Sequence, residues 1–130
     1  MKTIVRMVDV PINDWNNQTK GTVTLEIADG EFVLLQGPNG SGKSYLLNLM
    51  AALRVPSVGE VFLEGKRLTT MRERQKRAWR AGLGLIPSEP VLLNGYTVLE
   101  GLGFDGPASW ARALQTRNAM RWKRVSLRFR

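Results

Sequence analysis

The sequence GPNGSGKSYLLNLM, residues 37–50, decides the fold of this chain. Its first eight residues satisfy the phosphate-binding pattern G-x-x-x-x-G-K-[ST] in full. Gly37, Gly40 and Gly42 let the backbone adopt conformations that are closed to other residues. They also let backbone N–H groups approach a polyphosphate closely. The pattern therefore predicts a loop that binds the phosphates of a nucleotide.

The side chains of the loop complete this prediction. Lys43 supplies a mobile positive charge for the β- and γ-phosphates, and the Ser44 hydroxyl is placed to ligate Mg²⁺. A helix that starts near Ser44 would point its positive end at the same phosphates. ATP and Mg²⁺ are therefore the expected ligands. The expected binding residues in the loop are Gly37, Asn39, Gly40, Ser41, Gly42, Lys43, Ser44 and Tyr45, with Ser44 as the metal ligand.

The surroundings of the loop separate this interpretation from a chance match in a glycine-rich turn. A short apolar run, FVLLQ at residues 32–36, precedes the loop and is typical of a buried parallel strand. Apolar residues then recur at helical spacing over Tyr45–Leu53. Strand, loop and helix in this order are the context in which the pattern binds phosphate.

The rest of the sequence predicts four further strands and two further helices. Strands are predicted where β-branched and apolar residues alternate or cluster, and helices where capping or helical spacing is present. The predicted strands are Thr3–Val8, Thr22–Ile27, Val61–Leu63 and Leu83–Ile86; the predicted helices are a basic one over Thr70–Ala81 and one that opens at Thr97–Glu100.

Composition excludes several kinds of chemistry. The chain has 130 residues, no cysteine and no histidine, so disulfides, thiolate catalysis and histidine-based catalysis or metal sites are excluded. The net charge of +8 is distributed unevenly. Residues 1–105 hold 12 Lys/Arg and all 11 Asp/Glu, whereas residues 106–130 hold 7 Lys/Arg and no acid.

This asymmetry marks residues 106–130 as a basic tail of uncertain origin, for which three interpretations stay open. A shifted reading frame or a truncated gene would produce such an abrupt change in composition. A basic helix could contact nucleic acid or anionic lipid. The third interpretation is a solvated terminal segment without a dedicated partner.

Several segments, taken in order, resemble the ATP-binding subunit of ABC transporters. TVTLEIADGEFVLLQGPNGSGKS at 22–44 resembles the strand, turn, strand and phosphate loop of that family. PSVGEVFLEG at 56–65 and GLGLIPSEP at 82–90, followed by TVLE at 97–100, resemble its next segments. The basic helix before residue 82 is most similar to that of lipoprotein-release, macrolide-efflux and cell-division exporters. The resemblance covers residues 3–103.

The resemblance implies an α/β fold of the P-loop NTPase class, with an antiparallel β-subdomain at the N-terminus. Residues 1–105 would form the N-terminal part of the ATP-binding domain. Trp15 stands where the family places an aromatic ring that stacks on adenine, although a loop tryptophan that caps the β-subdomain is the alternative. Tyr45 replaces a Thr or Ser near the α-phosphate and would contribute its backbone N–H. Ser88 stands at the Q-loop position, and its side chain is too short to replace glutamine.

The family also requires an LSGGQ-like signature, an apolar strand that ends in Asp-Glu, and a late histidine. None of the three occurs in this sequence. Water attack on ATP needs Mg²⁺ held from both sides and a residue that positions the water. We therefore expect ATP binding as part of a transporter ATPase subunit, without efficient hydrolysis by this chain.

The resemblance implies transmembrane subunits and a second ATPase subunit as partners, and a cytoplasmic location at the inner face of the membrane. Two other functions stay open. The chain could be a non-catalytic module that occupies the dimer face of a transporter subunit. It could also be a basic nucleic-acid-binding protein with a vestigial phosphate loop, although nucleic acid is not the expected partner.

Overall fold

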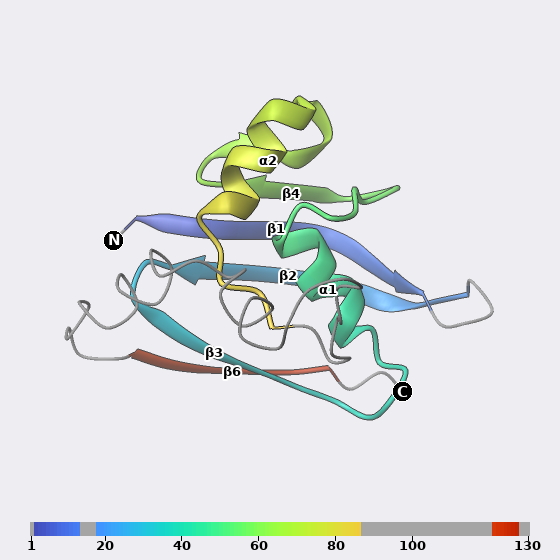
Figure 1. The fold of residues 1–130 in the computed structure, drawn as a ribbon. Coiled ribbons are helices and arrows are strands. Elements are labelled where there is room, and N and C mark those ends of the chain that lie inside the picture. Colours follow the sequence, from blue (N-terminus) through green and yellow to red (C-terminus); the bar gives the residue numbers. More distant parts are fainter. Residues whose placement is uncertain (1, 14–17, 87–120, 128–130) are drawn as a thin grey trace, which may run out of the picture.

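A computed structural model describes residues 2–13, 18–86 and 121–127 of the chain. Figure 1 shows two small sheets and two α-helices, one of which crosses in front of the strands. None of the helices in the described ranges is long and apolar enough to cross a membrane. The elements, in chain order, are β1 Thr3–Asn13, β2 Thr19–Ala28, β3 Glu31–Gln36, α1 Lys43–Met50, β4 Glu60–Leu63, β5 Lys66–Arg67, the 3₁₀ helix η1 Leu68–Thr70, α2 Glu73–Ala81 and β6 Arg121–Ser126.

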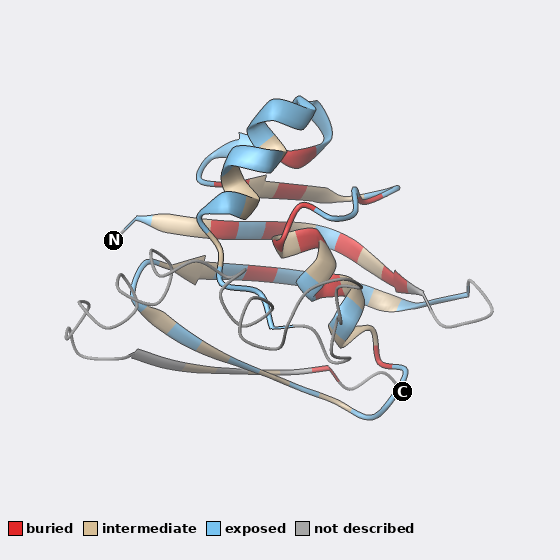
Figure 2. Cartoon of the chain, in the orientation of Figure 1, coloured by how far each residue is buried: buried red, intermediate tan, exposed pale blue. Residues whose placement is uncertain are grey.

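The larger sheet is the antiparallel β-subdomain that the family resemblance implies. Its strand order is β2-β1-β4-β5, and all its pairings are antiparallel. Alternating residues of β1 and β2 are buried on one face, as Figure 2 shows, because side chains of a strand point to opposite faces in turn. A two-residue turn, Glu64-Gly65, joins β4 to β5 with positive φ at both positions (48° and 79°), the geometry that fits a tight hairpin.

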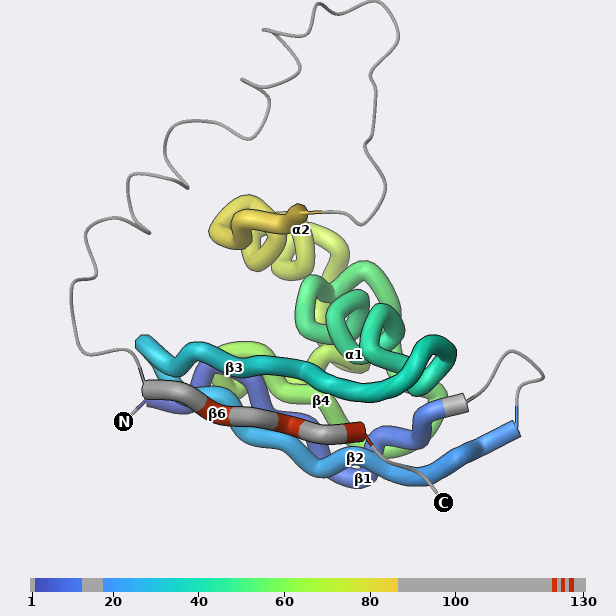
Figure 3. The backbone as a smooth tube through the Cα atoms, turned by 90° about the horizontal axis from the view of Figure 1, so that it is seen from below, coloured from blue at the N-terminus to red at the C-terminus, as the bar shows by residue number. Residues whose placement is uncertain are grey.

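The second sheet is a parallel pair formed by β3 and β6. Glu31 is level with Arg121, and the register continues without a shift to Gln36 and Ser126. The two strands lie side by side in Figures 1 and 3, although about 90 residues separate them along the chain. The phosphate loop follows directly from the carboxyl end of β3.

Helix α1 covers the core between the two sheets. Leu46 and Leu49 of α1 are fully buried, and so are Met7, Val10 and Ile12 of β1. These side chains form one apolar cluster with Leu63 of β4 and other buried residues. The helical spacing that predicts Tyr45–Leu53 is therefore confirmed as a buried face, with the helix itself at Lys43–Met50.

Helix α2 is attached to the end of α1 by two side chains. The indole N–H of Trp79 donates to the Met50 carbonyl at 2.8 Å, and Arg80 Nη1 donates to the Ala52 carbonyl at 2.7 Å. A hydrogen bond and charge from Lys76 lower the pKa of the Glu73 carboxyl on the same helix. No residue of α2 is buried, so most of this basic helix faces solvent.

Three predictions of secondary structure are wrong or incomplete. Leu83–Ile86 forms no strand; Gly82, Gly84 and Pro87 disfavour a ladder there, and Ile86 is 86% exposed. The strand β3 is not buried on both faces, since Phe32 and Leu34 remain exposed. Residues 121–126 of the basic tail form strand β6, not part of the basic helix that one interpretation of the tail assumes. The helix predicted to open at Thr97 lies outside the described residues.

Candidate nucleotide-binding site

The glycine-rich loop leaves β3 at Gln36 and enters α1 at Lys43. Gly40 and Gly42 have φ of 76° and 88°, in the left-handed region that glycine adopts without a steric cost. Gly42 is the N-cap of α1 and provides no capping side chain, and the first turn of α1 carries no acidic residue. The first N–H groups of the helix are therefore left for an external acceptor, and the positive end of the helix favours an anion there.

Lys43 bends back over the loop. Its Nζ donates to the Gly37 carbonyl at 2.6 Å, to the Pro38 carbonyl at 2.8 Å and to Ser41 Oγ at 3.3 Å. The ammonium group thus lies within the curve of the loop and is only partly exposed. A cation held in this position adds to the field of the helix N-terminus, so both attract a polyphosphate.

The other predicted loop residues are divided between the surface and the interior. Asn39 and Ser44 are exposed, so the Ser44 hydroxyl is accessible to a metal ion beside bound phosphates. Ser41 is only 3% exposed, and its N–H donates to the Pro38 carbonyl at 3.2 Å. The Tyr45 ring packs against the core, which leaves its backbone N–H in the first turn of α1.

These residues fit ATP and Mg²⁺ by their donors. The uncapped first turn of α1, one ammonium group and the absence of an acid from that turn suit a polyphosphate, and one hydroxyl suits a magnesium ion that keeps most of its ligands as water and phosphate oxygens. No group of three or more acidic residues that could hold a metal by itself occurs in the described ranges. Trp15 and Ser88, the predicted adenine and Q-loop positions, lie outside the described residues.

Residues that are distant in the sequence, and that the motif does not indicate, lie directly against the glycines of the loop. A Cβ atom on Gly42 would lie 2.1 Å from Ile12 Cγ2 at the end of β1. A Cβ on Gly37 would lie 2.6 Å from Ser41 Oγ and 2.9 Å from the Leu127 carbonyl oxygen. Ile12 and Leu127 therefore belong to the environment of the loop. Only the tertiary structure brings them there, because neither is near the motif in the sequence.

Replacing Gly42 with Ala is expected to destabilise the fold more than replacing Gly40 with Ala. Both positions have positive φ, which costs a side-chain-bearing residue about 1–2 kcal/mol. Only Gly42 also faces a clash, with Ile12, and overpacking of this kind typically costs a further ~1–3 kcal/mol. Urea unfolding followed by circular dichroism measures the two free energies of unfolding. Equal losses in both variants would show that Ile12 does not limit the space at Gly42.

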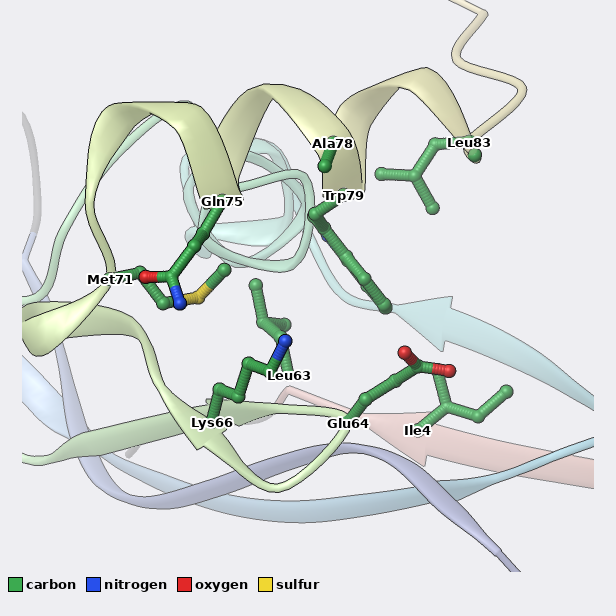
Figure 4. A pocket seen from close by; sticks show the side chains of 10 residues that line it. Ile4, Leu63, Glu64, Lys66, Met71, Gln75, Ala78, Trp79 and Leu83 are labelled. Atoms are coloured by element: carbon green, nitrogen blue, oxygen red, sulfur yellow. The ribbon is translucent and has the colours of Figure 1, made fainter.

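A separate pocket lies between α2 and the antiparallel sheet, with a volume of about 520 Å³. In Figure 4, Met71, Gln75 and Trp79 project from the α2 side toward Leu63, Glu64 and Lys66 of the β4–β5 hairpin. None of its lining residues comes from 37–45, so this pocket is distinct from the phosphate loop.

Comparisons with known proteins agree with the loop and its setting. A family model described as ABC transporter matches residues 21–128. An uncharacterized ABC transporter ATP-binding protein of Methanocaldococcus jannaschii is 40% identical over 81 residues. A nucleoside import ATP-binding protein of Lactococcus lactis is 35% identical over 101 residues, and an aliphatic sulfonates import ATP-binding protein of Nocardia farcinica is 46% identical over 80.

A solved structure also shares this fold. It is a dimeric ATP-binding cassette in a post-hydrolysis state, bound to ADP and phosphate, with a TM-score of 0.67 and 26% identity. The match includes 90% of this chain and 50% of the solved cassette. Its predicted fold class, a partial P-loop NTPase of the ATP-binding cassette type, is confirmed by this likeness.

The matches differ from the sequence analysis in two respects. The three alignments include 62%, 78% and 62% of this chain, in the order in which the relatives are named above. They include only 36%, 20% and 28% of the relatives' own lengths. The expected exporter subgroup is not supported, because these relatives include import ATP-binding proteins. The family match extends to residue 128, beyond the residues 3–103 of the initial resemblance, and so includes β6.

Proposed function

The chain belongs to the ABC transporter family, and we propose that it binds Mg-ATP through residues 37–45 as part of a transporter ATPase subunit. We further propose that this chain by itself does not turn ATP over efficiently. The transport of a substrate would belong to the complete assembly. The chain spans only 50% of the matching cassette and 36% of the length of the Methanocaldococcus jannaschii relative.

The observation that carries ATP binding is the open, uncapped N-terminus of α1 with Lys43 beside it. Three features support the same ligand: positive φ at two loop glycines, an ammonium group inside the loop, and an exposed hydroxyl at Ser44. In this proposal, backbone N–H groups and Lys43 hold the phosphates, and the Tyr45 N–H contacts the α-phosphate. Ser44 contributes one ligand to Mg²⁺, and Trp15 stacks on adenine.

Weak turnover follows from residues that the sequence lacks. Phosphoryl transfer to water needs a group that orients the water and charge that stabilises the γ-phosphate in the transition state. The chain has no histidine, no LSGGQ-like signature and no apolar strand that ends in Asp-Glu, and Ser88 replaces the Q-loop glutamine. The phosphate loop supplies binding and one Mg²⁺ ligand, which is insufficient for efficient hydrolysis.

Family membership also suggests where the chain works. We place it at the cytoplasmic face of a membrane, associated with transmembrane subunits and able to pair with a second ATPase subunit. The dimeric state of the matching cassette supports the pairing. A full-length partner subunit would have to supply the signature, because two copies of this chain have none to exchange.

Binding without turnover can be measured on one preparation. Calorimetric titration of the protein with Mg-ATP is expected to give saturable binding. Phosphate release under saturating Mg-ATP is expected to stay at the background of a Lys43→Ala sample handled in parallel. Saturable binding together with phosphate release well above that background would overturn the claim of weak turnover, and absence of binding would overturn the nucleotide site.

A further inference from the structure

Strand β6 is the neighbour of the strand that carries the phosphate loop. It pairs with β3 along the full length of both strands, up to Gln36 and Ser126. Val125 packs against the core, and Lys123 Nζ donates to the Glu26 carbonyl of β2. The strand is therefore fixed both to β3 and to the antiparallel sheet. Parallel strands end at the same edge, so the residue after β6 arrives beside the start of the loop (Figure 3).

That residue is Leu127. Its N–H donates to the Gln36 carbonyl at 2.7 Å, which extends the parallel ladder by one bond to the last residue before the loop. Its side chain is 3% exposed and belongs to the buried apolar cluster. The Leu127 carbonyl oxygen and Cβ lie 2.9 and 3.2 Å from the point that a Cβ on Gly37 would occupy. Leu127 thus lies directly against the first glycine of the loop.

The contact continues into the loop through Ser41. This serine is the buried polar residue of the described core, and its Oγ lies 2.6 Å from the same point beside Gly37. Ser41 Oγ also accepts a hydrogen bond from Lys43 Nζ. A continuous row of contacts therefore leads from Leu127 through Gly37 and Ser41 to the ammonium group that the proposed function assigns to the phosphates.

We propose that Leu127, presented by β6, is a positioning residue for nucleotide binding. It closes the space beneath Gly37 and fixes the path of the loop, so that Ser41 and Lys43 stay in the arrangement that receives phosphate. This inference rests on the proposed function of residues 37–45. It also assigns the basic tail a role in the nucleotide site, since β6 and Leu127 come from residues 106–130.

The test compares three variants of the full chain. Leu127→Ala keeps the carbonyl oxygen and the Cβ that lie against Gly37, but it removes the side-chain atoms beyond Cβ that are buried in the apolar cluster and hold Leu127 in place. Leu127→Met restores an apolar side chain of similar volume. Leu68→Ala is the matched control, because Leu68 is a fully buried leucine of the same core that lies in η1 beside β4. Affinity is measured with a fluorescent ADP analogue in the presence of Mg²⁺. The folded fraction of each variant is measured by circular dichroism and used to correct the affinity.

Leu127→Ala is expected to bind the nucleotide about tenfold more weakly than wild type, as when a tenth of the molecules hold a competent loop. Leu127→Met is expected to recover most of the affinity, and Leu68→Ala to retain it after correction. Equal affinities of folded Leu127→Ala and Leu68→Ala would overturn the proposal.

Hydrogen exchange of the nucleotide-free proteins gives a second readout that does not depend on binding. The amides of Gly37 and of residues 39–42 are expected to exchange faster in Leu127→Ala than in Leu68→Ala and wild type. If wild type binds no nucleotide, the proposed function fails, and exchange alone decides whether Leu127 fixes the loop. Unchanged loop exchange in folded Leu127→Ala would overturn its positioning role even if the nucleotide site is correct.

Discussion

Replacing Lys43 with Ala is expected to remove nearly all of the stabilisation that Mg-ATP gives to this protein. Charge-assisted hydrogen bonds are worth about 1.5–3 kcal/mol each, so the loss of two to the phosphates weakens binding by about 100-fold or more. At a concentration 100 times the wild-type Kd, ligand binding stabilises by about 2.7 kcal/mol, roughly 10 °C in Tm for a domain of this size. At that concentration the variant should be stabilised by about 0.4 kcal/mol or less, a rise in Tm of at most about 1.5 °C.

The readout is the rise in Tm on adding Mg-ATP, measured by differential scanning fluorimetry. The absolute Tm of the variant is less informative, because Lys43 also bonds the Gly37 and Pro38 carbonyls and its loss changes the free protein. Lys66→Ala is the control, since Lys66 is an exposed lysine of β5 outside the loop. If Mg-ATP raises the Tm of Lys43→Ala as much as it raises that of wild type and Lys66→Ala, the nucleotide does not bind at residues 37–45.

Deleting residues 121–130 is expected to abolish cooperative folding at 25 °C. In the described part of the chain, β6 is the only strand that pairs with β3, so deletion leaves β3 without a ladder. Burial of Leu127, which contributes about 1.5–3 kcal/mol when complete, and the partial burial of Val125 are also lost. These losses are comparable with a total stability of about 5–15 kcal/mol for a domain of ordinary stability. Urea unfolding followed by near-ultraviolet circular dichroism measures the effect.

A shorter deletion separates the strand from the residues that follow Leu127. Removing only residues 128–130 takes away two arginines and leaves β6 and Leu127 in place. This variant is expected to unfold cooperatively, close to wild type. If the longer deletion also folds normally and loses only salt-dependent affinity for DNA or RNA, the tail is a nucleic-acid-binding appendage and not a part of the sheet.

Local features explain the parts of the fold that the sequence predicts well. The loop 37–44 matches a strict pattern in which the glycines and the lysine serve phosphate binding, so its place between a strand and a helix can be predicted from the sequence. Strands β1 and β2 are also predicted, because they alternate buried and exposed residues along most of their length, whereas their antiparallel arrangement is implied by the family resemblance. The Asp29-Gly30 turn is equally local, with Gly30 at a φ of 72°.

The features that the sequence does not predict depend on distant contacts. Strand β6 carries several basic residues and has no clear apolar alternation, and its pairing with β3 spans about 90 residues. Leu83–Ile86 has the composition of a buried strand, but a strand needs a partner with free backbone groups, and in the described ranges it has none. The contacts of Gly37 with Leu127 and of Gly42 with Ile12 belong to the same class. Sequence patterns show that these glycines are needed but not which atoms lie against them.

The most direct test of the central claim is a titration of isotope-labelled wild-type protein with Mg-ATP, followed residue by residue through backbone amide resonances. The proposed site predicts that the largest shifts fall on residues 37–45 and saturate together with the calorimetric binding curve. Smaller shifts are expected at Leu127. None are expected at Met71 and Trp79, which line the separate pocket between α2 and the antiparallel sheet. Saturable shifts centred on that pocket or on the basic tail, with residues 37–45 unchanged, would contradict the assignment of this loop as the nucleotide site.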